Sequence, residues 1–158
     1  MKQIITILSF FLCLSVNAQE KAKYSGQGMN FQYTVLVQDS QNYVVLTMTS
    51  EKQVFAQQPT LMLKTFEGDI ITLVGEIVDS NKTTAGVMIS GIMFPVSERT
   101  FVAQFSISNE EIELLSKGIC KVRLATVPKL HEKEFKKDKI GLKLYTMFKD
   151  AWKQQNNF

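Results

Sequence analysis

Histidine and cysteine are scarce in this 158-residue sequence, which contains one histidine, His131, and two cysteines. A zinc site built from several histidines or several cysteines is therefore excluded. The sequence also lacks a glycine-rich phosphate loop and a G-x-S-x-G nucleophile elbow. We therefore predict no catalytic residues, no metal site and no cofactor, and we expect that the chain is not an enzyme.

The single histidine and Cys120 do not suggest a nucleophilic pair. His131 stands in a strongly charged stretch, which predicts an ordinary surface histidine rather than a general base. Cys120 alternates with Val122 and Leu124, which predicts a buried apolar position on a strand. A catalytic thiol must be reachable, so we expect no role for Cys120 as a nucleophile.

Long apolar runs are also missing, because no stretch reaches the roughly 20 residues that a membrane-spanning helix needs. The longest run, residues 4–14, follows Lys2 and precedes small residues that end at Ala18. This pattern predicts a signal peptide over residues 1–18, cut near Ala18–Gln19. We expect export to the periplasm, the outer membrane or the extracellular space, and a single domain over residues 19–158 without a transmembrane segment.

What the sequence does contain is a series of segments in which apolar and polar residues alternate, the pattern of half-buried strands. Turn-forming residues separate them at 39–42, 67–69 and 79–82, and Pro95 is expected to end a strand. The predicted strands cover residues 31–38, 43–49, 60–66, 70–78, 85–94, 99–107 and 119–127. We therefore predict an all-β fold, an antiparallel β-sandwich of about seven strands.

Two helices are predicted in the second half of the chain. Ser108 and Glu111 have the spacing of a capping box, and Gly118 suits the left-handed residue that ends a short helix before the last strand. The C-terminal residues 138–154 form an amphipathic pattern, with Asp138 as the expected N-cap.

Charge is distributed unevenly along the chain. Residues 19–116 hold 6 Lys and Arg against 11 Asp and Glu, whereas residues 117–158 hold 11 against 4. The candidate binding residues are the lysines that precede and enter the final helix: Lys133, Lys136, Lys137, Lys139 and Lys143. They predict an anionic envelope component or an acidic protein as the partner, and export argues against nucleic acid. The competing interpretation is that the helix packs on the sheet and its lysines only maintain solubility.

Two further functions stay open at this point. The protein could carry an apolar ligand inside the sandwich, in which case a continuous internal cavity is expected. It could instead be a hydrolase with paired carboxylates, for which Glu67, Asp69, Glu76 and Asp79 of one predicted hairpin are the available acids. That alternative requires two carboxylates facing one cleft.

Three segments carry a resemblance to other proteins: LMLKTFEGD (61–69), EEIELLSKGICKVRL (110–124) and EFKKDKIGLKLY (134–145). They resemble a group of small exported bacterial proteins of unassigned function, which are β-sandwich domains with a terminal helix. The resemblance covers about half of the chain after the predicted signal peptide. It implies export and this fold, and it implies no activity, ligand or functional residue.

Overall fold

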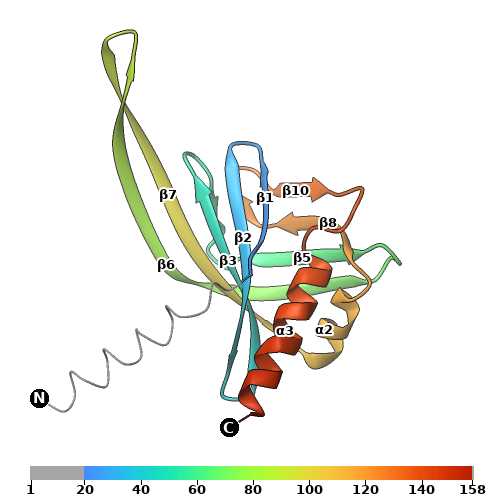
Figure 1. Ribbon diagram of the computed structural model, residues 1–158. Coiled ribbons are helices and arrows are strands. Elements are labelled where there is room, and N and C mark those ends of the chain that lie inside the picture. Colours follow the sequence, from blue (N-terminus) through green and yellow to red (C-terminus); the bar gives the residue numbers. More distant parts are fainter. Residues whose placement is uncertain (1–19, 158) are drawn as a thin grey trace, which may run out of the picture.

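The computed structural model describes residues 20–157, so the predicted signal peptide and its cleavage site lie outside the described residues. Strands dominate, and two helices accompany them (Figure 1). The strands are β1 (Ala22–Gly26), β2 (Met29–Gln38), β3 (Gln41–Ser50), β4 (Val54–Phe55), β5 (Thr60–Thr65), β6 (Ile70–Ile89), β7 (Ile92–Ile107), β8 (Ile119–Leu124), β9 (Thr126–Val127) and β10 (His131–Glu134). The helices are α2 (Asn109–Leu115) and α3 (Gly141–Gln155).

The main sheet is antiparallel, with the strand order β1-β2-β3-β7-β6-β5-β8-β10. Strand β6 belongs to both halves of this sheet, because residues 70–74 pair with β5 and residues 75–89 pair with β7. The sheet therefore turns at β6 and is nearly closed. The predicted all-β antiparallel class is confirmed, and the main sheet has eight strands instead of about seven.

The sheet bends within β6, where this strand changes its pairing from β5 to β7, and this bend depends on Gly75. A β-carbon at this position would lie 2.6 Å from the carbonyl oxygen of Gln104 and 2.6 Å from the ring of Phe105. The backbone of β6 can approach β7 this closely only because glycine has no side chain.

Beyond the bend, β6 and β7 extend as one long hairpin that projects from the body of the protein (Figure 1). The predicted turn at residues 79–82 and the predicted strand end at Pro95 are both wrong. The true turn is Ser90–Gly91, whose φ angles of 53° and 80° are those of a tight two-residue hairpin turn. The polar residues from 79 onward follow a shift of register between Ile77 and Asp79 instead of forming a turn.

Pro95 is compatible with a strand because of its position in the ladder. It faces Gly86, and in the alternation set by a two-residue turn this pair exchanges no backbone hydrogen bonds. The missing N–H of Pro95 therefore points away from the partner strand, and no ladder bond is lost.

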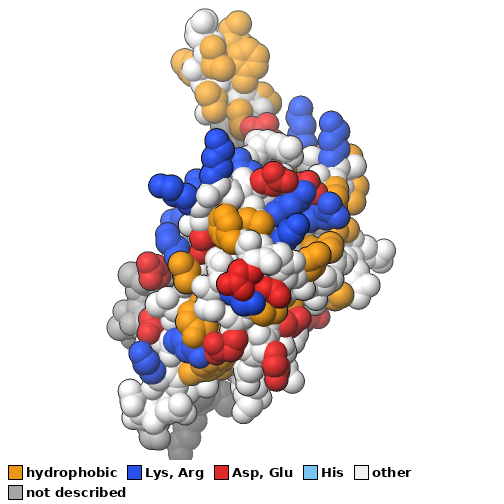
Figure 2. All heavy atoms as spheres, turned by 90° about the vertical axis from the view of Figure 1, so that its right-hand side faces the viewer, with side chains coloured by type: hydrophobic (Ala, Val, Ile, Leu, Met, Phe, Trp, Pro, Cys, Tyr) orange, Lys and Arg blue, Asp and Glu red, His pale blue; other side chains and the backbone are white. Residues whose placement is uncertain are grey.

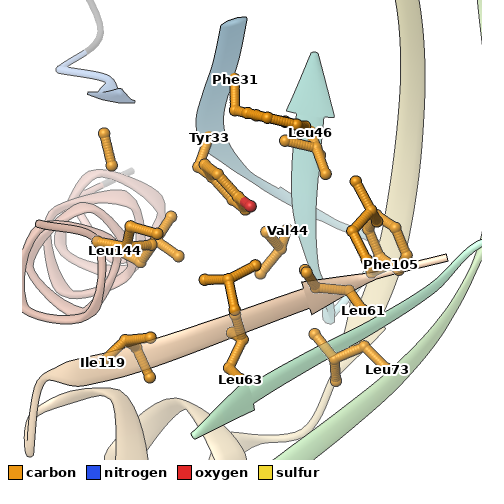
Figure 3. Close-up of a cluster of buried hydrophobic side chains, with 14 of the residues drawn as sticks. Phe31, Tyr33, Val44, Leu46, Leu61, Leu63, Leu73, Phe105, Ile119 and Leu144 are labelled. Carbon is orange, nitrogen blue, oxygen red and sulfur yellow. The ribbon is translucent and has the colours of Figure 1, made fainter. Parts of the chain in front are cut away.

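The core lies between the two halves of the curved sheet and is closed by α3. Figure 3 shows Tyr33 and Val44 on one side, Leu63 on the other, and Leu144 entering from α3. All four side chains are fully buried. Each strand turns one face toward this apolar interior, and apolar and polar residues therefore alternate along its sequence.

Both predicted helices are present. The capping box of Ser108 and Glu111 forms at the start of α2, and Gly118 has the expected positive φ, 74°. Helix α3 begins at Gly141 rather than at residue 138, yet the Asp138 carboxylate still accepts hydrogen bonds from the first backbone N–H groups of the helix. Within the part of the chain that the structure describes, no helix is long and apolar enough to cross a membrane.

The end of the sheet differs from the prediction. The strand expected over residues 119–127 is divided into β8 and β9, and β9 pairs with β4 in a separate two-stranded ribbon. Strand β10 was not predicted, because its residues His131–Glu134 are mostly charged and show no clear apolar alternation. It pairs with β8 and completes the sheet at that edge.

Candidate functional site

The five lysines of the predicted binding surface lie within one short stretch, residues 133–143, which we call the basic segment. Lys133 belongs to β10, Lys143 to the first turn of α3, and the other three to the connection between these elements. Lys133 is half-buried and the other four are exposed. The structure therefore brings the predicted residues together on one connection and its two flanking elements.

The acidic residues around the basic segment are already engaged. Glu132 forms ion pairs with Lys121 at 2.6 Å and Arg123 at 2.8 Å, and Glu134 lies 3.1 Å from Lys121. None of the ion pairs between described residues includes a lysine of the basic segment. The five charges are therefore left without a neutralising carboxylate at contact distance.

Asp138 is the acid inside the basic segment, and its carboxylate binds backbone N–H groups rather than a lysine. Its carboxylate accepts hydrogen bonds from the N–H groups of Ile119, Ile140, Gly141 and Leu142, at 2.7–3.1 Å. Burial raises the pKa of Asp138, but these four hydrogen bonds outweigh burial and hold the pKa below its ordinary value. Asp138 is therefore a charged structural residue that links the start of β8 to the start of α3.

The aromatic residues near the basic segment are committed to packing. Phe135 and Phe148 are buried. The Tyr145 hydroxyl donates to Glu113 at 3.2 Å, and the Trp152 ring N–H donates to the side-chain oxygen of Asn42 at 3.0 Å. The basic segment is thus a charged surface, without exposed aromatic rings from this part of the chain.

The outer part of the β6–β7 hairpin was missed by the sequence analysis as a candidate surface. Residues 83–97 contain no charged side chain, and the exposed fraction of their large apolar side chains is 36–66%. These side chains are Val87, Met88, Ile89, Ile92, Met93, Phe94 and Val96. Figure 2 shows this end as hydrophobic, with no charged side chains, whereas positive and negative groups are mixed over the body.

We call residues 85–96 the arm tip, and its two faces are both apolar. Met88 pairs with Met93 on one face, and Val87 pairs with Phe94 on the other. Side chains alternate between faces along a strand, so the apolar pairs on successive rungs cover both sides of the ribbon. The sequence pattern does not predict the long hairpin, because the turn-forming residues 79–82 suggest a division of this stretch into shorter strands, whereas they lie within β6.

His131 is not the surface residue that its charged neighbours suggest, because only 1% of it is exposed. Its Nε2 atom lies 3.1 Å from the hydroxyl of Tyr24, which in turn lies 3.1 Å from the hydroxyl of Tyr33. The imidazole also stacks on Phe31, with ring centroids 4.3 Å apart. β1 and β10 are the two edges of the sheet, so this cluster joins the edges through side chains.

The burial of His131 predicts a pH-dependent stability. Burial, assisted by the nearby Lys133 charge, lowers the pKa of His131 below its usual 6.5. The unfolded chain therefore binds a proton more readily than the folded one, so stability should be complete above pH 6.5 and should fall as the pH decreases below it.

We expect the midpoint of urea unfolding to decrease between pH 7 and pH 5, and His131→Phe to remove most of this decrease. The variant keeps the aromatic stack on Phe31 but cannot be protonated, and His131 is the only histidine in the chain. An equal decrease in the parent and the variant would contradict this assignment.

Cys120 is half-buried rather than fully buried as predicted. Its thiol lies 3.2 Å from the carbonyl oxygen of Thr65. The register of β5 against β8 shifts between Lys64 and Thr65, so the simple alternation that placed Cys120 with Val122 fails at this point.

Three of the four acids of the alternative hydrolase hypothesis, Glu67, Asp69 and Glu76, are held by basic or amide groups. Lys117 lies 2.9 Å from both Glu67 and Asp69, and hydrogen bonding to Lys117 lowers the pKa of Asp69. Glu76 instead accepts a hydrogen bond from Gln104 at 2.7 Å. A general acid of a glycosidase needs a raised pKa, so the environment of Asp69 disfavours that role.

A depression of about 610 Å³ opens between α2, α3 and the turn after β2. It is lined mainly by amides, two carboxylates and one face of Trp152. Asn42 bridges Trp152 and Asn109 by hydrogen bonds, so these three lining side chains satisfy one another. The interior between the two halves of the sheet, by contrast, is lined by buried apolar side chains (Figure 3).

No protein-family model, curated protein or solved structure matches this chain, so the function proposed below rests on the geometry of the described residues.

Proposed function

We propose that the protein is exported and acts by binding an anionic surface of the cell envelope, without catalysis. The two halves of the curved sheet, packed as a β-sandwich, serve as the scaffold. The observation that carries the proposal is the basic segment, in which five lysines form no ion pair with a carboxylate of residues 20–157. The neighbouring Glu132 and Glu134 are neutralised by Lys121 and Arg123.

The chemistry of these side chains favours anionic lipid headgroups as the partner. A lysine ammonium group is a point charge on a flexible chain and imposes no fixed bidentate geometry on an anion. Such charges suit a surface on which the anions are spread out and can rearrange. Near an anionic bilayer, each lysine contributes about 1 kcal/mol, and salt weakens this contribution.

The proposal is tested by reversing three charges with Lys136→Glu, Lys137→Glu and Lys139→Glu. All three side chains are exposed, so the fold should be retained. We expect binding to vesicles that contain phosphatidylglycerol to weaken by about a hundredfold at low salt, because about three favourable contributions of 1 kcal/mol are lost. Vesicle co-sedimentation measures the effect.

A matched control distinguishes the effect of the basic segment on vesicle binding from the effect of the total charge of the protein. Lys52, Lys64 and Lys153 are also exposed and form none of the ion pairs between described residues. Their reversal to glutamate changes the net charge equally and should weaken binding much less. If both triple variants lose the same amount of binding, or if neither does, the basic segment is not the contact surface.

A further inference from the structure

The arm tip gathers seven exposed large apolar side chains at the end of one hairpin, and it does not overlap with the basic segment. It consists of five successive pairs of uncharged residues, from Ala85↔Val96 to the pair beside the turn, Ile89↔Ile92. Soluble proteins rarely expose contiguous apolar side chains of this kind unless they contact a membrane or another protein.

We infer that the arm tip inserts into one leaflet of a lipid bilayer, with Lys82 and Arg99 at the level of anionic headgroups. This inference goes beyond the proposed function, because it concerns a different surface and holds whether or not the basic segment binds.

The apolar side chains of the arm tip require an apolar environment on both of its faces. Val87 and Phe94 form an apolar pair on one face, and Met88 and Met93 form another on the opposite face. A groove on a protein would cover one face and leave the other in water. Lipid acyl chains cover both, and Ser90 in the turn is the only side chain of the tip that could offer a specific hydrogen bond.

The length of the tip agrees with entry into one leaflet. Five rungs at about 3.3 Å each give roughly 16 Å, and a hydrocarbon core of about 30 Å gives about 15 Å for each leaflet. A ribbon tilted by about 45°, as strands in membranes are, would reach about 12 Å below the headgroups. The arm tip is therefore too short to cross a bilayer and long enough to enter one side.

The open edges of the ribbon limit the depth of entry. Backbone groups that face away from the partner strand find no hydrogen bonds among acyl chains. In the tip, the outward N–H groups belong to Gly86, Met88 and Met93, because Pro95 has none. Only the Gly86 N–H stays near the headgroups, whereas the Met88 and Met93 N–H groups lie deeper, so their cost limits how far the ribbon enters. Pro95 also prevents a strand of another chain from pairing at that position.

A pair of like charges marks the headgroup level. Lys82 and Arg99 face each other across the hairpin, three rungs above Ala85 and Val96. Like charges directly opposite each other destabilise a strand pair. A phosphate between them would remove this repulsion, and the tilt places both at about 7 Å above the hydrocarbon, within the headgroup layer.

The experiment compares the parent protein with a variant in which the four residues at the end of the tip become serine: Met88→Ser, Ile89→Ser, Ile92→Ser and Met93→Ser. These residues are exposed, so the melting temperature should not change. Vesicles of equal parts phosphatidylglycerol and phosphatidylcholine are the probe. We expect the variant to bind about a hundredfold more weakly, whereas Leu142→Ser, which alters an exposed leucine of α3, should bind as the parent does.

Insertion itself is measured with a fluorescent label. Ser90→Cys, in a chain whose two native cysteines are replaced by serine, carries a dye that reports the polarity of its surroundings. Its emission should shift to the blue when vesicles are added, and the shift should persist in about 0.5 M salt, where the Debye length is only about 4 Å.

Lys82→Glu with Arg99→Glu should weaken binding to vesicles with phosphatidylglycerol and leave binding to pure phosphatidylcholine unchanged.

Two results would overturn the inference. In one, the serine variant binds vesicles as well as the parent in about 0.5 M salt, where the basic segment is screened. In the other, the emission of the dye shifts with protein concentration in the absence of vesicles, which would show that a second copy of the chain covers the arm tip. Loss of binding in the basic-segment variant at low salt alone concerns the proposed function and leaves this inference standing.

Discussion

Gly75→Ala should destabilise the protein by about 3 kcal/mol, although it adds a single methyl group. That methyl group would lie 2.6 Å from the Gln104 carbonyl oxygen and 2.6–2.7 Å from the ring of Phe105. Phe105 is fully buried and Gln104 meets the site with its backbone, so neither can move aside without disturbing the sheet. The melting temperature should fall by about 10 °C.

Gly86→Ala on the same strand is the matched control. There the added methyl group would meet only the side chain of Met93, which is flexible and exposed and can rotate away. We expect a change within about 0.5 kcal/mol. Equal losses in the two variants would show that the close approach at Gly75 is not what the bend of β6 requires.

Asp138→Ala should cost about 3 kcal/mol, because it leaves three partly buried backbone N–H groups and the exposed N–H of Leu142 without their acceptor. Asp138→Asn should recover only part of this loss, because one amide oxygen replaces a charged carboxylate. Asp150→Ala is the control, since Asp150 is exposed on the same helix, and its effect should stay within about 0.5 kcal/mol. Chemical unfolding followed by circular dichroism measures all three variants.

The pH dependence of the Asp138 contribution has a definite sign. The folded-state pKa lies below the ordinary value of 3.8, so the contribution is fully present above 3.8 and is lost as the pH falls through the lower folded-state pKa. The pH range in which the Asp138 contribution is lost lies below the range expected for His131, so the two effects on stability can be measured separately. If Asp138→Ala destabilises the protein equally at pH 7 and at pH 3, the assignment is incorrect.

Most strands and both helices could be predicted because their signals are local. The alternation along β2 and β3 and the capping box at Ser108 arise from neighbours in sequence, and they match the structure closely. The end of the arm could not be predicted in the same way. Residues 79–82 have the composition of a turn, whereas Ser90–Gly91 is a weaker turn signal inside an apolar stretch.

The error at the arm has a physical cause. Strand β6 is 20 residues long, well beyond the usual length of a strand, so a break near residue 79 is the expected choice. Whether a Pro residue ends a strand depends on which side of the ladder its nitrogen faces, and this depends on the register with the partner strand. Register is a property of two segments together, and it places Pro95 where its missing N–H costs nothing.

The candidate site was predicted in part. The five lysines are identifiable from their spacing, but the pairing of Glu132 and Glu134 with Lys121 and Arg123 across two strands depends on the register of β10 against β8. His131 was misplaced for the same reason. Its neighbours in sequence are charged, yet β10 turns His131 toward Tyr24 and Phe31, which lie about 100 residues earlier.

The contacts of α3 also bear on the order in which the protein can form during synthesis. Trp152 bonds to Asn42, Gln155 bonds to the carbonyl of Val37, and Leu144 fills the space beside Tyr33. These partners leave the ribosome more than 100 residues before the helix that completes them. A nascent chain therefore lacks the last part of its interior until α3 has emerged, although the strands that line this interior are complete long before.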